Sequence, residues 1–348
     1  MGQSSVGKKT LKIEKCVQGG AGLARLPNGS VCFVEGALPG ELAEIKITEQ
    51  KKDFAKASVV KILEPHSKRR NPPCPYYGKC GGCNAQYAQF DLQIELLRQI
   101  VLDLFSRIAK INLPPNFEIH YGSEWGYRFR AQVFAPGGFQ MRGSNIVIPI
   151  EKCMVLSDKL NEKLKATEKT YLFDNQSEKF LGKYIHANES VFFQSNLELL
   201  PKLIEEACKA AGEGKLLFDV FCGVGLFSAF LQDKFERVIA IEQNPLCKKF
   251  AEKNLGKNCE FYATNAEEWN DFGGCVLIDP PRAGLTNKLF NKLKCDKIIY
   301  VSCSPATLAR DTRKLLDAGY ELASVQGFAF YPQTFHLEMM AVFIQGSS

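Results

Sequence analysis

The chain has 348 residues, of which 45% are hydrophobic, so it can bury a sizeable core and is longer than one typical domain. Its 44 Lys and Arg against 38 Asp and Glu give a net charge of +6, which permits a polyanionic partner without requiring one. No apolar stretch approaches membrane-spanning length and residues 1–9 lack the apolar core of a signal peptide, so we expect a cytoplasmic protein. We also expect a monomer. Thirteen cysteines without a secretory signal are not expected to form a disulfide framework. Some should bind metal, react or pack.

Short apolar runs divided by turn signals indicate a small barrel between residues 10 and 63. The runs cover residues 11–16, 31–34, 41–47 and 58–62. The turn signals are Gly19-Gly20, Asn28-Gly29 and Pro39-Gly40. Residues 20–25 and 35–41 resemble the motifs of a TRAM domain, an OB-like barrel that binds RNA.

The barrel and the residues after it carry a local excess of positive charge. The basic residues are Lys46, Lys51, Lys52, Lys56 and Lys61, followed by Lys68, Arg69 and Arg70. Phe33 and Phe54 are available to stack on nucleic-acid bases. A solvated charged face explains the same composition equally well, so this segment alone leaves RNA binding open.

Three cysteines form a tight group, with Cys74, Cys80 and Cys83 in the pattern Cys-x5-Cys-x2-Cys. The glycines between them let the backbone curl around a centre while the thiolates point inward, so we predict a metal centre. Of possible fourth ligands Cys153 is the best, because two others alternate within predicted strands and the rest fall in the C-terminal half. The spacing does not separate a 4Fe-4S cluster from tetrahedral zinc.

Two further elements are predicted before the C-terminal half. Residues 88–108 have the periodicity of an amphipathic helix, whose apolar stripe is core and carries no functional message. Residues 127–134 alternate as a strand with arginines on one face, which could touch phosphate or simply face solvent.

A cofactor site is predicted where residues 216–220 form a strand that runs into the turn Phe221-Cys222-Gly223-Val224-Gly225. The next strand, 238–241, ends at Glu242, which is placed to accept hydrogen bonds from ribose hydroxyls. A dinucleotide site would have glycine at the third position of G-x-G-x-x-G, where this chain has Ser228. The acid Asp219 followed by the two glycines is instead the arrangement of class I methyltransferases that use S-adenosylmethionine (SAM).

The reactive residues are expected at neighbouring strand ends. Asp279 follows the strand 275–278 and precedes Pro280-Pro281, and Cys303 follows the strand 297–301. A strand-end cysteine more often packs than reacts, and the aspartate could simply cap a helix. Glu338 begins an apolar strand, where a bare carboxylate is costly unless it is paired or needed, and His336 lies two residues before it. Either could act as a base, although a lone histidine is more often structural.

Together these features resemble the RNA uracil-5-methyltransferase family over nearly the whole chain. The resemblance rests on the TRAM-like barrel and on six motifs: the four cysteines, Phe193-Gln194-Ser195-Asn196, the turn after Asp219, Asp279-Pro280-Pro281-Arg282, Ser302-Cys303-Ser304-Pro305 and Thr334 to Glu338. It implies an α/β protein with a TRAM-like barrel at residues 1–63, a small central α+β domain with an iron–sulfur cluster at 64–189, and a Rossmann-like SAM-dependent domain at 190–348. Two positions depart from the family pattern, Leu226 after the second glycine and Ser304 after the nucleophile.

The resemblance also implies roles for single residues. Cys303 is the nucleophile that adds to uracil C6, and Glu338 is the base that removes the C5 hydrogen after methyl transfer. Residues expected to line the SAM site are Gln194, Phe221, Glu242, Asn265 and Asp279. The four cysteines are expected to hold a 4Fe-4S cluster, with zinc as the fallback. We expect the thiol either to be activated by its surroundings or to pass its proton on as the enolate forms.

The expected substrate is a uridine flipped out of a folded RNA, with 23S ribosomal RNA favoured over transfer RNA by analogy. One alternative is a cytosine-5-methyltransferase, although its usual second cysteine is absent from Asp279-Pro280-Pro281-Arg282. The other is an RNA-binding iron–sulfur protein without methyl transfer, which would leave the glycine turn and Glu242 without purpose.

Overall fold

The computed structural model describes residues 9–165, 170–173 and 177–346. The chain divides into two units, each built from separate stretches of sequence. Unit 1 takes residues 1–101, 139–148 and 331–336, and unit 2 takes 102–138, 149–330 and 337–348. The domain boundaries predicted after residues 63 and 189 remain predictions.

Unit 1 is built on one six-stranded sheet in the order β1-β5-β6-β4-β3-β2. The strands are β1 (Lys9–Lys12), β2 (Lys15–Cys16), β3 (Gly22–Arg25), β4 (Val31–Glu35), β5 (Leu42–Gln50) and β6 (Phe54–Glu64). Because only residues 13 and 14 connect the two outermost strands, the sheet must curve back on itself. Alternate residues such as Cys32, Val34 and Ala57 fill its core, with at most 1% of each exposed. Strand β3, which the sequence analysis treated only as a motif, completes the sheet.

Several of the predicted basic residues of unit 1 are engaged within the unit. Arg69 forms an ion pair with the fully buried Glu41 at 2.6 Å, and its guanidinium also donates to the Gly36 carbonyl. Burial opposes ionisation of Glu41, but Arg69 and two backbone N–H groups hold its pKa below the usual value. Arg69 therefore stabilises the barrel, and RNA binding by the run 68–70 stays a prediction.

Residues 90–186 form a long helix, a short helix and several short strands. Helix α1 (Phe90–Leu104) continues into the π-helical turn η1 (Phe105–Ala109), close to the predicted helix 88–108. Of the predicted strand 127–134 only β8 (Arg130–Val133) is regular. The other elements are β7 (Ile119–His120), β9 (Gly138–Gln140), β10 (Val147–Pro149), α2 (Asp158–Glu162), β11 (Thr170–Phe173), β12 (Ser177–Phe180) and β13 (Lys183–His186). No helix in the described part of the chain is both long and apolar enough to cross a membrane.

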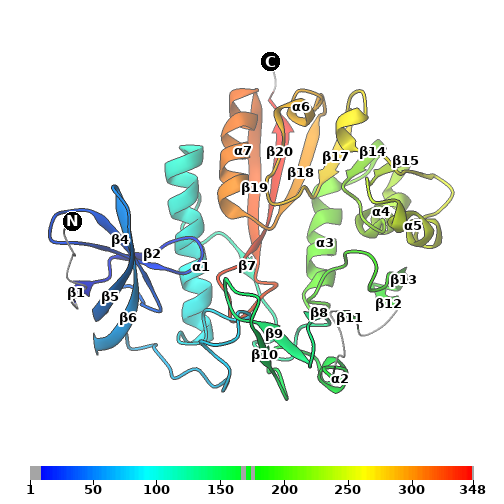
Figure 1. Ribbon diagram of the computed structural model, residues 1–348. Coiled ribbons are helices and arrows are strands. Elements are labelled where there is room, and N and C mark those ends of the chain that lie inside the picture. The colour runs from blue at the N-terminus through cyan, green and yellow to red at the C-terminus, as the bar shows by residue number, and fades with distance from the viewer. Residues whose placement is uncertain (1–8, 166–169, 174–176, 347–348) are drawn as a thin grey trace. The chain divides into compact units, whose positions relative to one another are not determined.

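Unit 2 is organised by an eight-stranded sheet in the order β16-β15-β14-β17-β18-β20-β19-β7. Figure 1 shows β17, β18, β20 and β19 beside one another at its centre. Its main strands are β14 (Gly214–Val220), β15 (Phe235–Ile241), β16 (Cys259–Tyr262), β17 (Cys275–Ile278), β18 (Lys297–Ser302), β19 (Tyr320–Phe328) and β20 (Glu338–Gln345). The first five strands of the order are parallel, whereas β20 runs antiparallel to both neighbours. Strands β17 and β18 are almost wholly buried, as their continuous apolar runs predict.

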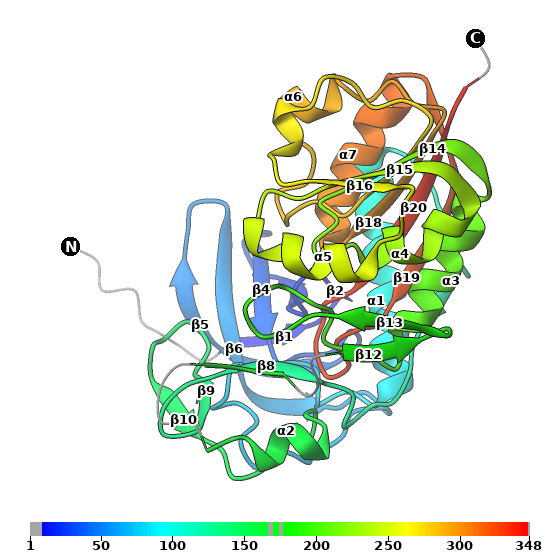
Figure 2. The same ribbon diagram turned by 90° about the vertical axis from the view of Figure 1, so that its right-hand side faces the viewer.

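Helices pack against this sheet and against one another. They are α3 (Leu200–Ala211), α4 (Leu226–Leu231), α5 (Lys248–Asn254), α6 (Asn287–Phe290) and α7 (Pro305–Asp317), with 3₁₀ turns η2 (Gln232–Lys234), η3 (Pro245–Cys247) and η4 (Ala266–Glu268). Helix α7 packs on η1 and on β18, β19 and β20, while α3 packs on α4 and β18. Strands β12 and β13 pair as an antiparallel hairpin. Helix α5 contacts β13, and Figure 2 shows the hairpin below α5.

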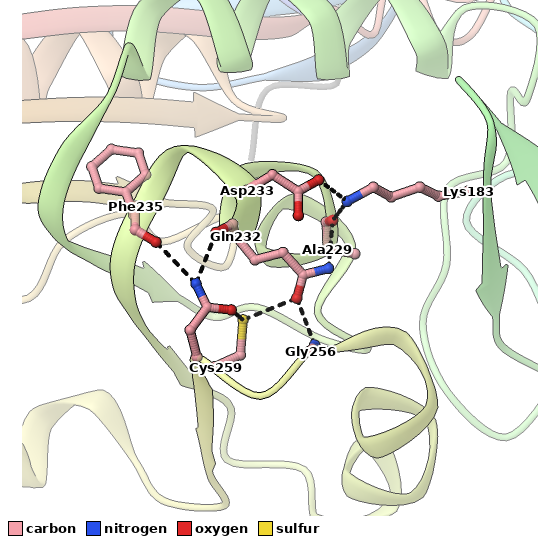
Figure 3. A network of polar contacts seen from close by, with 8 residues as sticks. Lys183, Ala229, Gln232, Asp233, Phe235, Gly256 and Cys259 are labelled. Carbon is pink, nitrogen blue, oxygen red and sulfur yellow. Dashed lines mark hydrogen bonds and ion pairs between the residues drawn. The ribbon is translucent and has the colours of Figure 1, made fainter.

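A polar network ties α4 and the turn η2 to strand β13, which precedes them, and to residues 256–259, which follow (Figure 3). Lys183 donates to the Ala229 carbonyl at 2.7 Å and pairs with Asp233 at 2.6 Å. The Gln232 side chain accepts hydrogen bonds from the Gly256 amide and, at 3.3 Å, from the Cys259 thiol. The Cys259 thiol is therefore engaged within the network. The network holds helix α4, which begins directly after the glycine turn.

Candidate active site

The residues predicted to react or to bind SAM gather at one edge of the unit 2 sheet. Phe221, Glu242, Asp279 and Cys303 each follow the last residue of a parallel strand. Glu338 is the first residue of β20, and because β20 is antiparallel its start lies at that same edge. The register pairs Ser302 with Met339, and Cys303 and Glu338 are the residues next to this pair along the chain. The two lie close enough for the charge of Glu338 to act on the Cys303 thiol.

The nucleophile candidate and the base candidate influence each other electrostatically. Cys303 is half-buried; burial and the nearby Glu338 raise the pKa of its thiol, while the guanidinium of Arg282 lowers it. Glu338 is only 4% exposed, and burial, reinforced by the charge of Asp279, raises its pKa well above the ordinary value. The net effect of these surroundings is a raised pKa of the thiol, so they do not by themselves favour the thiolate.

The loop that carries Arg282 is pinned to helix α7. Asp311 is fully buried and accepts hydrogen bonds from the Leu285 amide at 2.9 Å and from the Tyr300 hydroxyl at 2.9 Å. Thr307 donates to the Arg282 carbonyl at 3.0 Å. Gly284, at φ +77°, lies so close to Thr307 and Asp311 that a Cβ has no room. Helix α7 therefore positions both Cys303, which precedes it, and Arg282.

The turn after β14 has the geometry expected of a glycine-dependent cofactor loop. Phe221, Gly223 and Gly225 have φ values of +63°, +56° and +78°. Glu242 accepts hydrogen bonds from the Gly223 amide at 3.1 Å and the Asn244 amide at 2.8 Å, which orients its carboxylate at the turn. A carboxylate so held retains acceptor capacity for ribose hydroxyls.

Asp219 and Asp279 add buried negative charge beside the turn. The backbone amide and hydroxyl of Ser228 donate to Asp219 Oδ2 at 3.0 and 2.6 Å, so Ser228 secures this acid. Burial nevertheless raises the pKa of Asp219 to about 6. Burial, with the charges of Asp219 and Glu242, also raises the pKa of Asp279. Acids held near one another in this way favour a cationic ligand.

The remaining predicted cofactor residues differ in their surroundings. Gln194 is buried, with 6% exposed, in a segment held by the bond from the Phe129 amide to the Ser195 carbonyl. Asn265 is exposed, and its side chain caps η4 by accepting from the Glu267 amide at 2.9 Å. Leu226 starts α4 and is buried. The SAM contacts expected of all five residues stay predictions, namely Gln194, Phe221, Glu242, Asn265 and Asp279.

The cysteine group is divided between the units, with Cys74, Cys80 and Cys83 in unit 1 and Cys153 in unit 2. Over residues 9–165, 170–173 and 177–346, no three His, Cys, Asp or Glu side chains are arranged to hold a metal ion. One feature does suit a thiolate ligand, since the Gly82 amide donates to Cys80 Sγ at 3.4 Å. The metal centre therefore remains a prediction, and no catalytic step depends on it.

Comparisons with known proteins show the family to which the chain belongs. A sequence model described as tRNA (Uracil-5-)-methyltransferase matches residues 151–271 and 267–346, and one described as TRAM domain matches residues 6–60. The chain belongs to the RNA uracil-5-methyltransferase family. It is accordingly a SAM-dependent RNA methyltransferase, as the sequence predicts.

Individual relatives agree with this family over almost their full length. A protein named 23S rRNA (uracil(1939)-C(5))-methyltransferase RlmD from Shewanella amazonensis is 30% identical, covering 97% of this chain and 95% of its own. An Aquifex aeolicus protein named an uncharacterized RNA methyltransferase is also 30% identical, covering 95% and 97%. The solved structure of the Pyrococcus abyssi tRNA (uracil-54, C5)-methyltransferase in complex with S-adenosyl-L-homocysteine has a TM-score of 0.73 at 20% identity, covering 97% of this chain and 100% of that one. The predicted fold class is confirmed.

Two site residues were missed by reasoning from the sequence alone. Arg282 was quoted within a motif but given no role, although an arginine beside two prolines at a strand end is a signal that was available. Asp311 gave no such signal, because an acid within a helix of mixed charge ordinarily faces solvent. His336 was weighed as an alternative base; it belongs to unit 1, whereas Cys303 and Glu338 belong to unit 2.

Proposed function

We propose that the protein methylates C5 of a uridine in 23S ribosomal RNA, with Cys303 as nucleophile and Glu338 as base. The observation that supports this most is the neighbouring position of these two residues, at the end of β18 and the start of the antiparallel β20. The choice of RNA is supported by relatives named 23S rRNA methyltransferases that match nearly the whole chain. An enzyme that modifies ribosomal RNA would work in the cytoplasm.

The reaction begins with the uracil ring, whose C5 is too weak a nucleophile to take a methyl group directly. The Cys303 sulfur bonds to C6, and the thiol proton passes to the C4 oxygen as the enol forms. This route suits a thiol whose pKa is raised in the free protein. Arg282 beside the sulfur favours its anionic character as the proton leaves.

Methyl transfer and release then follow. The enol attacks the methyl group of SAM through C5, the C4 oxygen loses its proton, and the sulfonium becomes a neutral thioether. Glu338 in its ionised form takes the hydrogen left on C5, the electron pair of that bond restores the C5–C6 double bond, and the Cys303 thiolate leaves. SAM would lie against Gln194, Phe221, Glu242, Asn265 and Asp279, and its positive charge would favour ionisation of the neighbouring acids.

The test uses RNA labelled with tritium at uracil C5. We expect wild-type protein to release tritium only when SAM is present, and Cys303→Ala to release none. Glu338→Gln should accumulate a covalent protein–RNA adduct that survives denaturing electrophoresis. Tritium release by Cys303→Ala at the wild-type rate would refute the nucleophile, and methyl transfer by Glu338→Gln without any adduct would refute the base. Release from transfer RNA transcripts in place of 23S transcripts would refute the proposed target.

We also propose that Cys74, Cys80, Cys83 and Cys153 hold a 4Fe-4S cluster with a structural role. The Gly82 amide bond to the Cys80 sulfur supports this, because N–H donors stabilise thiolate ligands. Anaerobically purified protein should contain about four irons and absorb in the visible range, and Cys80→Ser should lose both. Cys208→Ser, which changes a half-buried cysteine of α3, is the matched control and should keep them. Stoichiometric zinc without iron would contradict the cluster.

A further inference from the structure

The segment Tyr331–His336 lies immediately before the proposed base and belongs to unit 1, although its neighbours on both sides belong to unit 2. Leu337 alone separates it from Glu338. Glu338 itself pairs with Phe328 of β19, and this segment is the chain that leads into it. The bonds that hold it concentrate on one residue, Gln333.

Gln333 is fully buried and has a φ of +69°, a left-handed conformation that non-glycine residues seldom adopt. Its side-chain oxygen accepts hydrogen bonds from Gln93 Nε2 and from Arg70 Nη2, each at 3.1 Å. Its own backbone amide donates to Gln93 Oε1 at 3.0 Å, so the two glutamines bond reciprocally. A strained conformation persists only where its surroundings over-determine it, and such positions cluster at functional sites.

The same segment is also bonded to the chain that directly follows Cys83. The amides of Asn84 and Ala85 both donate to the Gln333 carbonyl, at 3.0 and 2.9 Å. The Phe335 amide donates to Asn84 Oδ1 at 3.2 Å. The ring of Phe335 also packs against Gly20, where even a Cβ has no room. The end of the cysteine loop, the barrel and helix α1 thus grip the residues that lead into Glu338.

We propose that Gln333 is a positioning residue, which sets the Glu338 carboxylate for removal of the C5 hydrogen by holding the segment 331–336 against Gln93 and the end of the cysteine loop. This inference rests on the proposed function, because it assigns Glu338 the role of base.

The consequence is specific to one step of the reaction. A misplaced base leaves the thiol free to add to C6 and the methyl group free to transfer, but it slows removal of the C5 hydrogen. The methylated RNA then stays bonded to Cys303. A purely structural role for Gln333 would instead lower the amount of working enzyme, so that adduct formation and turnover fall together.

The experiment compares full-length variants with RNA labelled at C5 and SAM labelled in its methyl group. Gln333→Gly keeps the left-handed turn and the three backbone bonds but removes the side-chain bonds. Gln93→Ala removes the partner and leaves Gln333 intact, which tests the same contact if the first variant folds poorly. Gln99→Ala is the matched control, because Gln99 is exposed on the same helix and its side chain donates to Glu95 one turn away.

We expect tritium release by Gln333→Gly and Gln93→Ala to fall roughly tenfold to hundredfold, the scale of loss when a catalytic group is misplaced by about 1 Å. Both variants should accumulate a methyl-labelled covalent adduct, and Gln99→Ala should match the wild type. A proportional loss of adduct and release, or unchanged release, would overturn the inference. Glu338→Gln separates the two claims: if it accumulates adduct and the glutamine variants do not, only the positioning role fails, whereas if it accumulates none, the base assignment fails first.

Discussion

Replacing the buried Asp311 with alanine should destabilise unit 2 far more than a change at an exposed position of α7. The substitution removes the acceptor for the Leu285 amide and for the Tyr300 hydroxyl, both of which are buried. Each buried donor left without a partner costs about 1–3 kcal/mol, so the pair amounts to about 4 kcal/mol. Arg310 loses its ion pair too, but it is 45% exposed and is rehydrated, so this loss adds little.

The assay is denaturant unfolding followed by tryptophan fluorescence. Both tryptophans, Trp125 and Trp269, belong to unit 2, so the signal reports on that unit. Asp317→Ala is the matched control, because Asp317 lies on the same helix and pairs with Arg313 while 65% exposed. An exposed pair of this kind should change the free energy of unfolding by less than about 1 kcal/mol.

The same variant should also loosen the loop that carries Arg282, so protein that remains folded should release tritium more slowly than the wild type. A loss of unfolding free energy below about 1 kcal/mol for Asp311→Ala, or one no larger than for Asp317→Ala, would refute the reasoning. Two buried donors left unpaired should cost more free energy than that.

Two other predictions concern the same unit. Because burial raises the pKa of Asp219 from 3.8 to about 6, the folded state favours its protonated form, and stability present at low pH is lost as pH rises through about 6. Between pH 4 and pH 7 the free energy of unfolding of the wild type, measured by denaturant titration, should therefore fall by up to about 3 kcal/mol relative to that of Asp219→Asn. If the unfolding free energies of the two proteins change in parallel with pH, the buried protonated Asp219 is contradicted. Gly284→Ala should lower the melting temperature by several degrees, because the added Cβ meets α7 at a φ of +77°, whereas Gly273→Ala has open space and should change it little; equal shifts for both would count against the close packing.

The sequence predicted the sheet of unit 2 well because its strands are continuous apolar runs that end in single polar residues. Phe221, Glu242, Asp279 and Cys303 therefore fell at strand ends as expected. That Glu338 lies beside Cys303 could not be derived from periodicity, since it depends on β20 being inserted antiparallel between β18 and β19. The family resemblance supplied that pairing, and the strand register agrees with it.

Charge was harder to interpret from the sequence than hydrophobicity. Arg69 belongs to the most basic run of the chain, yet its guanidinium neutralises the buried Glu41. Lys51 and Lys56 both pair with Glu49 on the barrel. A long side chain can reach partners far along the chain, such as Glu41 at a separation of 28 residues, and composition alone contains no information about which partner it finds.

The division of unit 1 into three stretches of sequence constrains the order in which the chain can fold during synthesis. Gln333 bonds to Gln93 across 240 residues and to Arg70 across 263. When the barrel and α1 leave the ribosome, their buried amides and side chains still lack these partners, which are among the last residues made. The barrel strands can pair early, but unit 1 is complete only once residues 331–336 have been made. Nascent chains interrupted before residue 331 should therefore expose the Asn84–Ala85 backbone to water and to proteases, and the enzyme cannot be divided into an N-terminal and a C-terminal half without damaging both.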